Sequence, residues 1–382
     1  MKIGIDIRCL AEGNRTGVEE YTIGFLKRLF EQDSDNKYLL FINSFKKIKE
    51  DISWLGEYPN VEIRNYAFPN KLLNFAMWFL HWPKIDTLLG GADIFFAPNI
   101  SFIALSSKCK FILTMHDLSF ERFPEYFSRK RRLWHYVVNP RLLCKRADKI
   151  LAVSKSTKDD LSMLYGIPKK KIEVVYPSLD LKSFSESDIS GEKTLRMMRD
   201  YKLPDEFILF LGTIEPRKNI VSLVKAFEHL KGTSKLYENL KLVIAGRVGW
   251  SYQEIISAVE ISPNKSDILF TGFVNDFDKA SLYKLAKIFV YPSFFEGYGF
   301  PPVEAMANGV PVITSNCSSI PEVVQDAAIL IDPYRPAEIS LAIRLLLDNK
   351  VLYNDFIKKG KKHISEIEES YFKEDLLSYF KI

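Results

Sequence analysis

Hydrophobic residues recur along the chain as short β-branched and aromatic runs, and amphipathic segments of helical period lie between them. Lys2–Arg8 alternates apolar and polar positions, and an amphipathic segment follows it at about Glu19–Phe30. A second series starts at Phe207–Leu211 and continues into a helical pattern at Ile220–Lys231, for which Asn219 is a suitable N-cap. Strands that alternate with helices form parallel sheets with helical crossovers. The chain is therefore predicted to be an α/β protein.

The two series imply two Rossmann-like, doubly wound parallel-sheet domains. A polar segment, Ser185–Arg199, lies between them, and a composition shift of this kind marks a domain boundary. We predict an N-terminal domain over residues 1–190 and a C-terminal domain over residues 191–360. Residues 361–382 are charged and helical in pattern, and we expect them to form a C-terminal helix that crosses back to the N-terminal domain.

The most informative segment is Ile288–Thr314, which is predicted to form a strand, a loop, a short helix and a second strand. Glu296 lies in the loop and Glu304 lies on the helix. Gly297 and Gly299 allow the backbone to approach a ligand closely. Loops at the carboxyl ends of parallel strands bind ligands in such folds. An ordinary strand–helix corner with two surface acids is an equally open interpretation of this spacing.

The predicted helix of this segment has suitable signals at both ends. Pro301 and Pro302 fit its first turn, and Gly309 fits the residue just past its end. A helix start presents free N–H groups and a positive dipole end to an anion. The segment is not a dinucleotide fingerprint, because Pro302 stands where the third glycine would be.

Four further residues are candidates for a site. Arg217 and Lys218 are adjacent cations between a strand and a helix start, which suits a diphosphate, although a solvated surface turn would look the same. His116 follows the predicted strand Lys110–Thr114, at the edge of the sheet where sites form. A lone histidine is more often structural than functional. In the first domain, the loop with Gly17 would overhang the same edge.

Composition limits the class of protein. The 382 residues are 47% hydrophobic and 26% charged, with a net charge of +5 that does not imply nucleic-acid binding. No long apolar run is free of charge, and Asp6 and Arg8 interrupt the apolar N-terminus, which argues against a membrane span and a secretory signal. The 4 cysteines are scattered, as in a reduced cytoplasmic protein.

Two segments combine aromatic and basic residues. Lys71–Leu89 contains Trp78 and Trp82 and is either a buried helix or an interfacial surface for a lipid-linked substrate. Ser128–Asp148 is predicted to be a helix with a basic face, Arg129–Arg146, which is either solvated or held by anionic lipid headgroups. We expect peripheral association with the inner face of the cell membrane.

Other chemistries lack their motifs. The sequence contains no GxxxxGK[ST] phosphate loop, no GxSxG elbow, no HExxH and no CxxC pair. No close Asp-x-Asp pattern follows a strand near the predicted site, which disfavours a metal-dependent transferase. We expect no metal and no cofactor other than the co-substrate of the reaction.

Several motifs in a fixed order strongly resemble glycosyltransferase family 4, whose members are retaining, sugar-nucleotide-dependent enzymes of the GT-B fold. The second half carries FLGTIEPRKNIVSLVKAF, LVIAG, FTGFV, YPSFFEGYGFPPVEAMANGVPVITSN and IPEVV, and the first half carries TGVEEY, HDLSF and AVSKST. TIEPRKN also resembles bacterial and archaeal mannosyltransferases of surface-polysaccharide assembly. In one respect the chain departs from many relatives, because Glu19 stands where they have a second glycine in the first-domain loop.

The resemblance implies a role for each matching residue, with His116 and Glu296 as the catalytic pair. His116 would contact the transferred sugar, and Glu296 would lie near the donor sugar. The donor diphosphate would be bound by Arg217, Lys218 and Gly17. The donor nucleotide and sugar would be bound by Glu304, which holds the ribose, by the backbone of Gly297, Tyr298, Gly299 and Phe300, and by Val274, whose backbone reads the base.

The implied reaction is metal-independent transfer of a sugar, by preference mannose from GDP-mannose, to a hydroxyl of a glycan or lipid-linked glycan. The two domains would face each other across a cleft and close on the donor. Retention of configuration is possible through a covalent intermediate or through same-face attack assisted by the leaving phosphate, which the resemblance favours. A UDP-sugar donor, an epimerase or phosphorylase on the same fold, and a non-catalytic binding protein are the alternatives.

Overall fold

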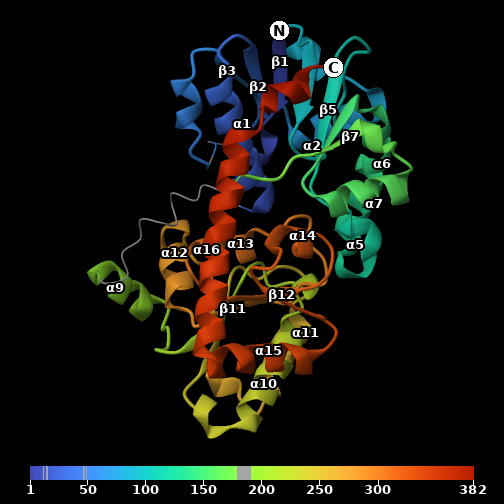
Figure 1. Ribbon diagram of the computed structural model, residues 1–382. Helices are drawn as coiled ribbons and strands as arrows, with labels where there is room; N and C mark the ends of the chain where they lie inside the picture. Colours follow the sequence, from blue (N-terminus) through green and yellow to red (C-terminus); the bar gives the residue numbers. More distant parts are fainter. Residues whose placement is uncertain (12, 14–15, 46–47, 49, 179–190) are drawn as a thin grey trace. The chain divides into compact units, whose positions relative to one another are not determined.

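A computed structural model describes residues 1–11, 13, 16–45, 48, 50–178 and 191–382 (Figure 1). These residues divide into two compact units. The first unit comprises Met1–Arg122, Arg129–Leu179 and Lys373–Ile382, and the second comprises Phe123–Ser128 and Asp180–Phe372. The chain therefore leaves the first unit and returns to it twice, and both termini lie in it (Figure 1).

In the first unit, the described residues form a seven-stranded parallel sheet in the order β3-β2-β1-β4-β5-β6-β7. The central strands are apolar and fully buried; Ile3 and Ile5 of β1, for example, are 0% exposed. The strands are β1 (Lys2–Asp6), β2 (Lys37–Asn43), β3 (Val61–Tyr66), β4 (Ile94–Ala97), β5 (Lys110–Met115), β6 (Lys149–Ala152) and β7 (Ile172–Val174).

Helices connect these strands, as parallel pairing requires. The α-helices are α1 (Gly17–Gln32), α2 (Asn70–Phe75), α3 (Ile85–Leu88), α4 (Ser119–Arg122), α5 (Arg129–Val138), α6 (Pro140–Arg146) and α7 (Lys155–Tyr165). Short helical turns are η1 (Arg8–Ala11), η2 (Ser53–Glu57), η3 (Ala76–Leu80), which is a π-helix, η4 (Pro124–Tyr126) in the second unit, and η5 (Lys169–Lys171).

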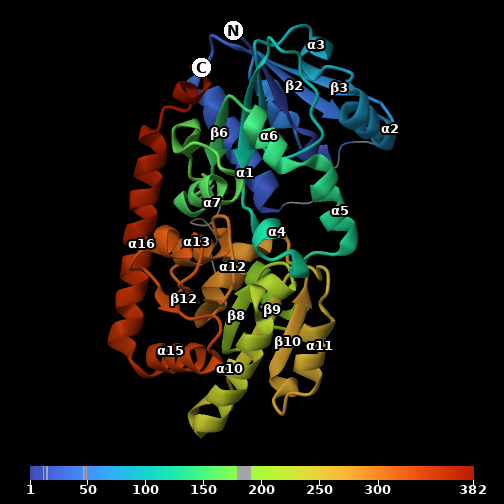
Figure 2. The same cartoon turned by 90° about the vertical axis from the view of Figure 1, so that its right-hand side faces the viewer.

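In the second unit, the described residues form a six-stranded parallel sheet in the order β10-β9-β8-β11-β12-β13. Its strands are β8 (Phe207–Leu211), β9 (Lys241–Ala245), β10 (Ile268–Gly272), β11 (Ile288–Tyr291), β12 (Val312–Ser315) and β13 (Ile329–Ile331), of which Figure 2 shows β8, β9 and β10 side by side. The predicted α/β class and the two parallel-sheet domains are confirmed.

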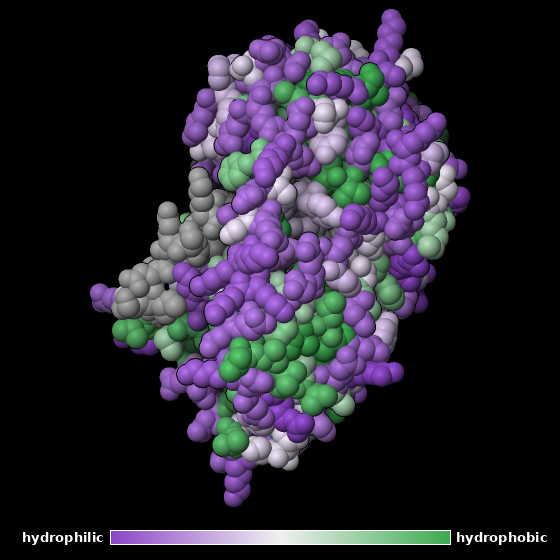
Figure 3. All heavy atoms as spheres, in the orientation of Figure 1, coloured by the Kyte–Doolittle hydropathy of each residue, from purple (hydrophilic) through white to green (hydrophobic). Residues whose placement is uncertain are grey.

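The helices of the second unit alternate with its strands. They are α9 (Glu192–Asp200), α10 (Ile220–Thr233), α11 (Gln253–Glu260), α12 (Asp276–Leu285), α13 (Phe300–Ala307), α14 (Ile320–Val324), α15 (Pro336–Asp348) and α16 (Lys350–Lys373), with short turns η6 (Pro216–Lys218), η7 (Lys235–Tyr237) and η8 (Lys265–Asp267). Hydrophilic residues follow the outer side of α16 (Figure 3).

The last residues of the chain pack within the first unit. The predicted C-terminal helix, residues 361–382, is instead α16, which begins at Lys350 and ends at Lys373, followed by η9 (Leu376–Phe380). Glu374 Oε2 pairs with Arg28 Nη1 at 3.2 Å, and the buried ring of Phe380 packs against Phe96. Parts of the predicted linker, residues 185–190, lie outside the described residues.

The basic helix predicted over Ser128–Asp148 is wrong in one respect, because two helices, α5 and α6, replace it. Asn139 separates them with a φ of 52°, and its side chain accepts a hydrogen bond from Leu142 N at 3.0 Å. The cause is Pro140, which lacks an N–H and disfavours a helical conformation for the residue before it. Arg129–Arg146 is therefore a bent basic surface, not one helix.

Asn219 occupies the predicted N-cap position of α10, but its side chain does not cap the helix. The residue has a φ of 58°. Its Nδ2 instead donates to the carbonyls of Pro292 at 3.0 Å and Pro333 at 2.7 Å. The side chain of Asn219 thus connects this turn to two segments that are distant in the sequence.

The segment Lys71–Leu89, predicted to be either a buried helix or an interfacial surface, buries Met77 and Ile85 but exposes several aromatic side chains. Trp78 is 46% exposed, Phe79 is 65% exposed and Trp82 is 65% exposed. The buried-helix interpretation is wrong for these side chains. Among the described helices, none is both long enough and apolar enough to cross a bilayer.

Candidate functional site

The direction of the chain across the second sheet changes at β8 and β11. β8 pairs with β9 on one side and with β11 on the other, so the connections run in opposite directions from this point. In open α/β sheets, ligands bind outside the carboxyl ends of the strands at such a switch point. The loop after β8 contains η6, with Arg217 and Lys218, and the loop after β11 contains Glu296.

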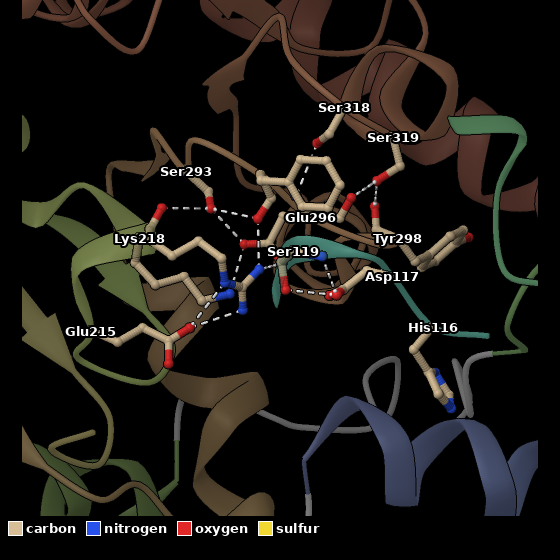
Figure 4. A network of polar contacts seen from close by, with 12 residues as sticks. His116, Asp117, Ser119, Glu215, Lys218, Ser293, Glu296, Tyr298, Ser318 and Ser319 are labelled. Atoms are coloured by element: carbon tan, nitrogen blue, oxygen red, sulfur yellow. Dashed lines mark hydrogen bonds and ion pairs between the residues drawn. The ribbon is translucent and has the colours of Figure 1, made fainter. Parts of the chain in front are cut away.

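The two loops meet through Glu296. Its Oε2 accepts a hydrogen bond from Arg217 Nη1 at 2.8 Å, and its Oε1 accepts from Lys218 Nζ at 2.6 Å and from Ser293 Oγ at 2.6 Å. Figure 4 shows Lys218 and Ser293 converging on this carboxylate. The structure thus brings together three residues that the sequence analysis singled out separately or in pairs.

A second carboxylate engages the other side of Arg217. Glu215 Oε1 accepts from Arg217 Nη2 at 2.8 Å and from Nε at 3.1 Å. Arg217 Nη1 also donates to the Phe295 carbonyl at 2.6 Å. These contacts fix the guanidinium plane, because a fork of N–H donors has one orientation that satisfies them all.

These charged groups lie inside the protein. Glu215 is 2% exposed, Glu296 is 6% exposed and Lys218 is 7% exposed. Burial alone would raise the pKa of Glu296, but the charges of Arg217 and Lys218 outweigh burial and lower it to about 2. Burial and the neighbouring charge of Arg217 lower the pKa of Lys218, and both carboxylates oppose that shift. Glu296 is therefore ionised throughout the physiological pH range.

The loop from Gly297 to Phe300 is held at its main chain. Ser319 Oγ donates to the carbonyls of Glu296 at 3.0 Å and Tyr298 at 2.9 Å, and Ser318 Oγ accepts from Glu296 N at 2.9 Å (Figure 4). Gly299 has a φ of 103°, and a Cβ there would lie 2.5 Å from Ile320 Cδ1. Only glycine fits this position without strain.

The helix after this loop follows the predicted pattern. α13 begins at Phe300, has proline in its first turn, and is followed by Gly309 with a φ of 72°. Both predicted end signals are confirmed. Pro301 and Pro302 carry no N–H, so within the first three residues of α13 only Phe300 has an amide that a ligand could use.

Glu304 and Val274 are largely buried in this unit. Glu304 is 9% exposed, and its Oε2 accepts a hydrogen bond from Tyr283 OH at 2.7 Å. Val274 is 2% exposed and follows Gly272 at the end of β10, whose carbonyl accepts from Gly246 N at 2.8 Å. Because the side chain of Val274 is buried, a ligand could contact this residue only through its main chain.

Two predicted residues belong to the first unit. Gly17 is the first residue of α1, and residues 12, 14 and 15 of the preceding loop lie outside the described residues. Glu19, which stands where many relatives have a glycine, has a structural role here. Its Oε2 accepts a hydrogen bond from Thr16 N at 2.9 Å and completes a capping box at the start of α1.

His116 follows β5 and is held by the protein. Its Nε2 donates to the Pro98 carbonyl at 2.8 Å, since a carbonyl only accepts, and Tyr21 packs edge-on at a ring-centroid distance of 5.0 Å. Burial lowers the pKa of His116, although the hydrogen bond to Pro98 opposes that shift. The ring is thus uncharged at neutral pH. Its Nε2 carries the proton that is donated to Pro98, and Nδ1 is the unprotonated nitrogen.

Sequence reasoning missed the residues that support the site. Glu215 precedes the two cations within TIEPRKN, and an acid two residues before adjacent cations is a signal that was available. Ser293 gives a weaker signal, because a serine after a strand has many roles. Ser318 and Ser319 are distant in the sequence and could be assigned only from the fold.

Known proteins resemble the chain in both halves. A family model described as "Glycosyl transferases group 1" matches residues 196–363, and one described as "Glycosyltransferase Family 4" matches residues 16–183. O-antigen chain mannosyltransferase B of Escherichia coli is 35% identical over 227 residues, which are 58% of this chain and 57% of that protein. Serotype-specific mannosyltransferase WbdA of Escherichia coli is 32% identical over 259 residues, 67% of this chain and 31% of that protein.

The chain therefore spans less than two thirds of the length of either relative. Among solved structures, sucrose-phosphate synthase from Thermosynechococcus elongatus superposes with a TM-score of 0.73 at 16% identity, covering 96% of this chain and 94% of that chain. At this identity the likeness concerns the fold, and the predicted GT-B architecture of two parallel-sheet domains is confirmed.

Proposed function

From its membership of the glycosyltransferases, to which both of its domains belong, we propose that this chain transfers mannose from GDP-mannose to a hydroxyl of a glycan or lipid-linked glycan. The observation that carries the proposal is the adjacent pair of Arg217, which is partly buried, and Lys218, which is buried, at the switch point of the second sheet. The preference for mannose is supported by TIEPRKN and by the two relatives named as mannosyltransferases.

The donor would lie along the carboxyl edge of the second sheet. Arg217 and Lys218, with the amide of Phe300 at the start of α13, would bind the diphosphate. Glu304 would accept hydrogen bonds from the ribose diol, for which one of its oxygens is already oriented by Tyr283. The main chain at Val274 would read the base.

The chemistry follows from where charge develops. Breaking the bond between sugar and phosphate places positive charge on the sugar and negative charge on the leaving diphosphate. Oriented cations and helix-end amides oppose that negative charge in a site shielded from water, which supports transfer without a metal ion. His116 of the first unit would contact the transferred sugar.

Retention of configuration would proceed by same-face attack of the acceptor, assisted by the leaving phosphate. Both oxygens of Glu296 are engaged, one by Arg217 and the other by Lys218 and Ser293, and such engagement weakens a carboxylate as a nucleophile. This supports the route without a covalent intermediate.

The reaction would take place at the inner face of the cell membrane, on a surface of the first unit. α2 and η3 expose Phe75 (53%) and Phe79 (65%), and Trp82 (65%) is exposed just after η3, all within the aromatic segment Lys71–Leu89. α5 exposes Tyr136 at 82% among four consecutive cations, Arg129–Arg132. Aromatic side chains beside clustered cations fit an interface with anionic lipid.

Donor choice tests the proposal directly. Thermal unfolding of the purified chain is measured with GDP-mannose, UDP-glucose and UDP-galactose, and we expect stabilisation by GDP-mannose above the others. Stabilisation by the UDP-sugars alone would overturn the assignment of the donor. Conversion of a donor to its isomer without an acceptor would identify an epimerase instead.

A further inference from the structure

Glu296 joins the two cations of the proposed diphosphate site. Its carboxylate spans both cations of the proposed diphosphate site, Arg217 at 2.8 Å and Lys218 at 2.6 Å. Such a carboxylate contacts these two groups as a phosphate would, with one oxygen on each cation.

Among the described residues, Glu215 pairs with Arg217 alone, with its Oε1 at 2.8 Å from Arg217 Nη2. Within the described part of the chain, this cluster holds two cations and two carboxylates, and the formal charges cancel. Burying two cations without partners is costly, and this pairing offsets the cost in the absence of a donor. It also fixes where the cations point before a donor arrives.

The same pairing has a cost once an anion binds. A donor diphosphate carries about two negative charges, and the nucleoside diphosphate released by the reaction carries about three. Both carboxylates repel these charges at short range in a buried site. The repulsion is greatest for the product, because it carries the most charge.

We propose that Glu296, together with Glu215, is a built-in counter-ion of the diphosphate site that aims Arg217 and Lys218 and prevents them from retaining the released nucleoside diphosphate. Glu296 is thus a positioning residue that acts through the cations, not a contact to the donor sugar. The inference rests on the proposed function in that the bound anion is the donor's diphosphate.

Two features beyond charge agree with this assignment. Ser293 Oγ donates to Glu296 Oε1 at 2.6 Å, and Ser318 Oγ accepts from Glu296 N at 2.9 Å, so the residue is anchored at both side chain and main chain. Tyr291 OH accepts from Lys218 Nζ at 2.5 Å, which holds the ammonium against the carboxylate. An internal contact this well anchored is suited to orient its partners.

Affinity for the sugar-free anion separates the two roles of Glu296. Isothermal titration measures the binding of inorganic pyrophosphate, GDP and UDP to the wild type and to Glu296→Gln. We expect Glu296→Gln to bind pyrophosphate at least about tenfold more tightly, because one buried negative charge is removed. A sugar contact would instead leave pyrophosphate affinity unchanged and weaken only the sugar nucleotide.

Two further variants keep the result interpretable. Glu215→Gln is expected to tighten pyrophosphate binding about three- to tenfold, because this carboxylate pairs with Arg217 alone. It tests the counter-ion role even if Glu296→Gln fails to fold. Glu304→Gln is the matched control, a buried acid of the same unit whose hydrogen bond comes from Tyr283, and it should leave pyrophosphate affinity unchanged.

Steady-state kinetics adds a readout that a purely structural role would not move. Glu296→Gln should lower both KM and kcat, because release of the product becomes slower. Unchanged or weaker pyrophosphate binding in Glu296→Gln and Glu215→Gln, or equal tightening in Glu304→Gln, would overturn the inference. Tighter pyrophosphate binding in a protein whose wild type binds neither GDP nor UDP would support the counter-ion role and overturn the proposed function.

Discussion

In the second unit, the loops after β8 and β11 bring Arg217, Lys218 and Glu296 into direct contact inside the protein, whereas in the first unit the cations and aromatics lie on the outside. α5 exposes Arg129–Arg132, and η3 exposes Trp78 and its neighbours. Both units are parallel sheets with helical crossovers. The two units thus share an architecture but differ in the burial of their charged groups.

This difference separates two kinds of recognition. Buried, paired cations recognise one anion of defined geometry, and they lose little strength to salt. Exposed cations beside aromatic rings recognise a surface, and salt weakens them.

The largest effect is expected from Lys218→Ala. The variant removes a buried donor of the proposed diphosphate site, and we expect sugar transfer to fall about 10²- to 10³-fold in kcat/KM. It also leaves Glu296 with one cation fewer, at a cost of about 3 kcal/mol in the free energy of unfolding. Lys225→Ala, at an exposed position of α10, is the control and should change neither quantity. Full activity in Lys218→Ala would remove the cluster from the donor site.

The exposed surface of the first unit is tested by the triple variant Trp78→Ser, Phe79→Ser, Trp82→Ser. We expect binding to vesicles with anionic lipid to fall at least about tenfold, since each ring contributes about 1.5–3 kcal/mol when buried. Sedimentation with vesicles measures it. The double variant Leu236→Ser, Ile261→Ser removes comparably exposed apolar residues from the second unit and should retain binding.

The cations of α5 sharpen the same test. Replacing Arg129, Lys130, Arg131 and Arg132 with Gln should weaken binding to anionic vesicles and remove its salt dependence, at about 1 kcal/mol per well-placed cation. Equal binding of the wild type to neutral and anionic vesicles would contradict a basic lipid-binding surface.

A change in the backbone of the loop from Gly297 to Phe300 is expected to have a smaller effect. Gly299→Ala forces a φ of 103° on a residue with a Cβ and places that atom 2.5 Å from Ile320 Cδ1. We expect a loss of about 2 kcal/mol in the free energy of unfolding, measured with urea. Gly232→Ala, where no atom lies within 4 Å of the added Cβ, should be neutral or slightly stabilising. Equal stability of the two variants would show that the loop adapts.

The smallest effect concerns His116 and acid. Burial lowers the pKa of His116 in the folded protein, so the unfolded chain binds a proton more readily. Stability should therefore decline as the pH falls through the ordinary histidine pKa, and His116→Asn should decline less over the same range. Urea unfolding at pH 7 and pH 5 compares the two proteins. An identical loss in both would contradict a buried, uncharged His116.

Local patterns predicted much of the second unit. The start of α13 at Phe300, its end before Gly309, and the adjacent cations at Arg217 and Lys218 each depend on near neighbours in the sequence. The pairing of Glu296 with both cations could not be predicted, because it depends on β8 and β11 being neighbours in the sheet. Spacing along the chain contains no information on that distance.

Other differences came from tertiary contacts or from competing local rules. Asparagine is a favoured N-cap residue, yet the side-chain amide of Asn219 donates to the carbonyls of Pro292 and Pro333, which are far away in the sequence. Pro140 was a local signal for the break between α5 and α6, and it was outweighed by the helical period on either side. Glu19 was recognised as a departure from relatives, but only the structure shows that it caps α1.

The most direct test of the account follows labelled mannose from GDP-mannose into lipid-linked glycan acceptors, with the anomeric configuration of the product determined by NMR. The account predicts transfer by the wild type without added metal, an α-linked product as in the donor, and a loss of about 10²-fold or more in Lys218→Ala. Transfer from a UDP-sugar but not from GDP-mannose, an inverted product, or equal transfer by Lys218→Ala would contradict it.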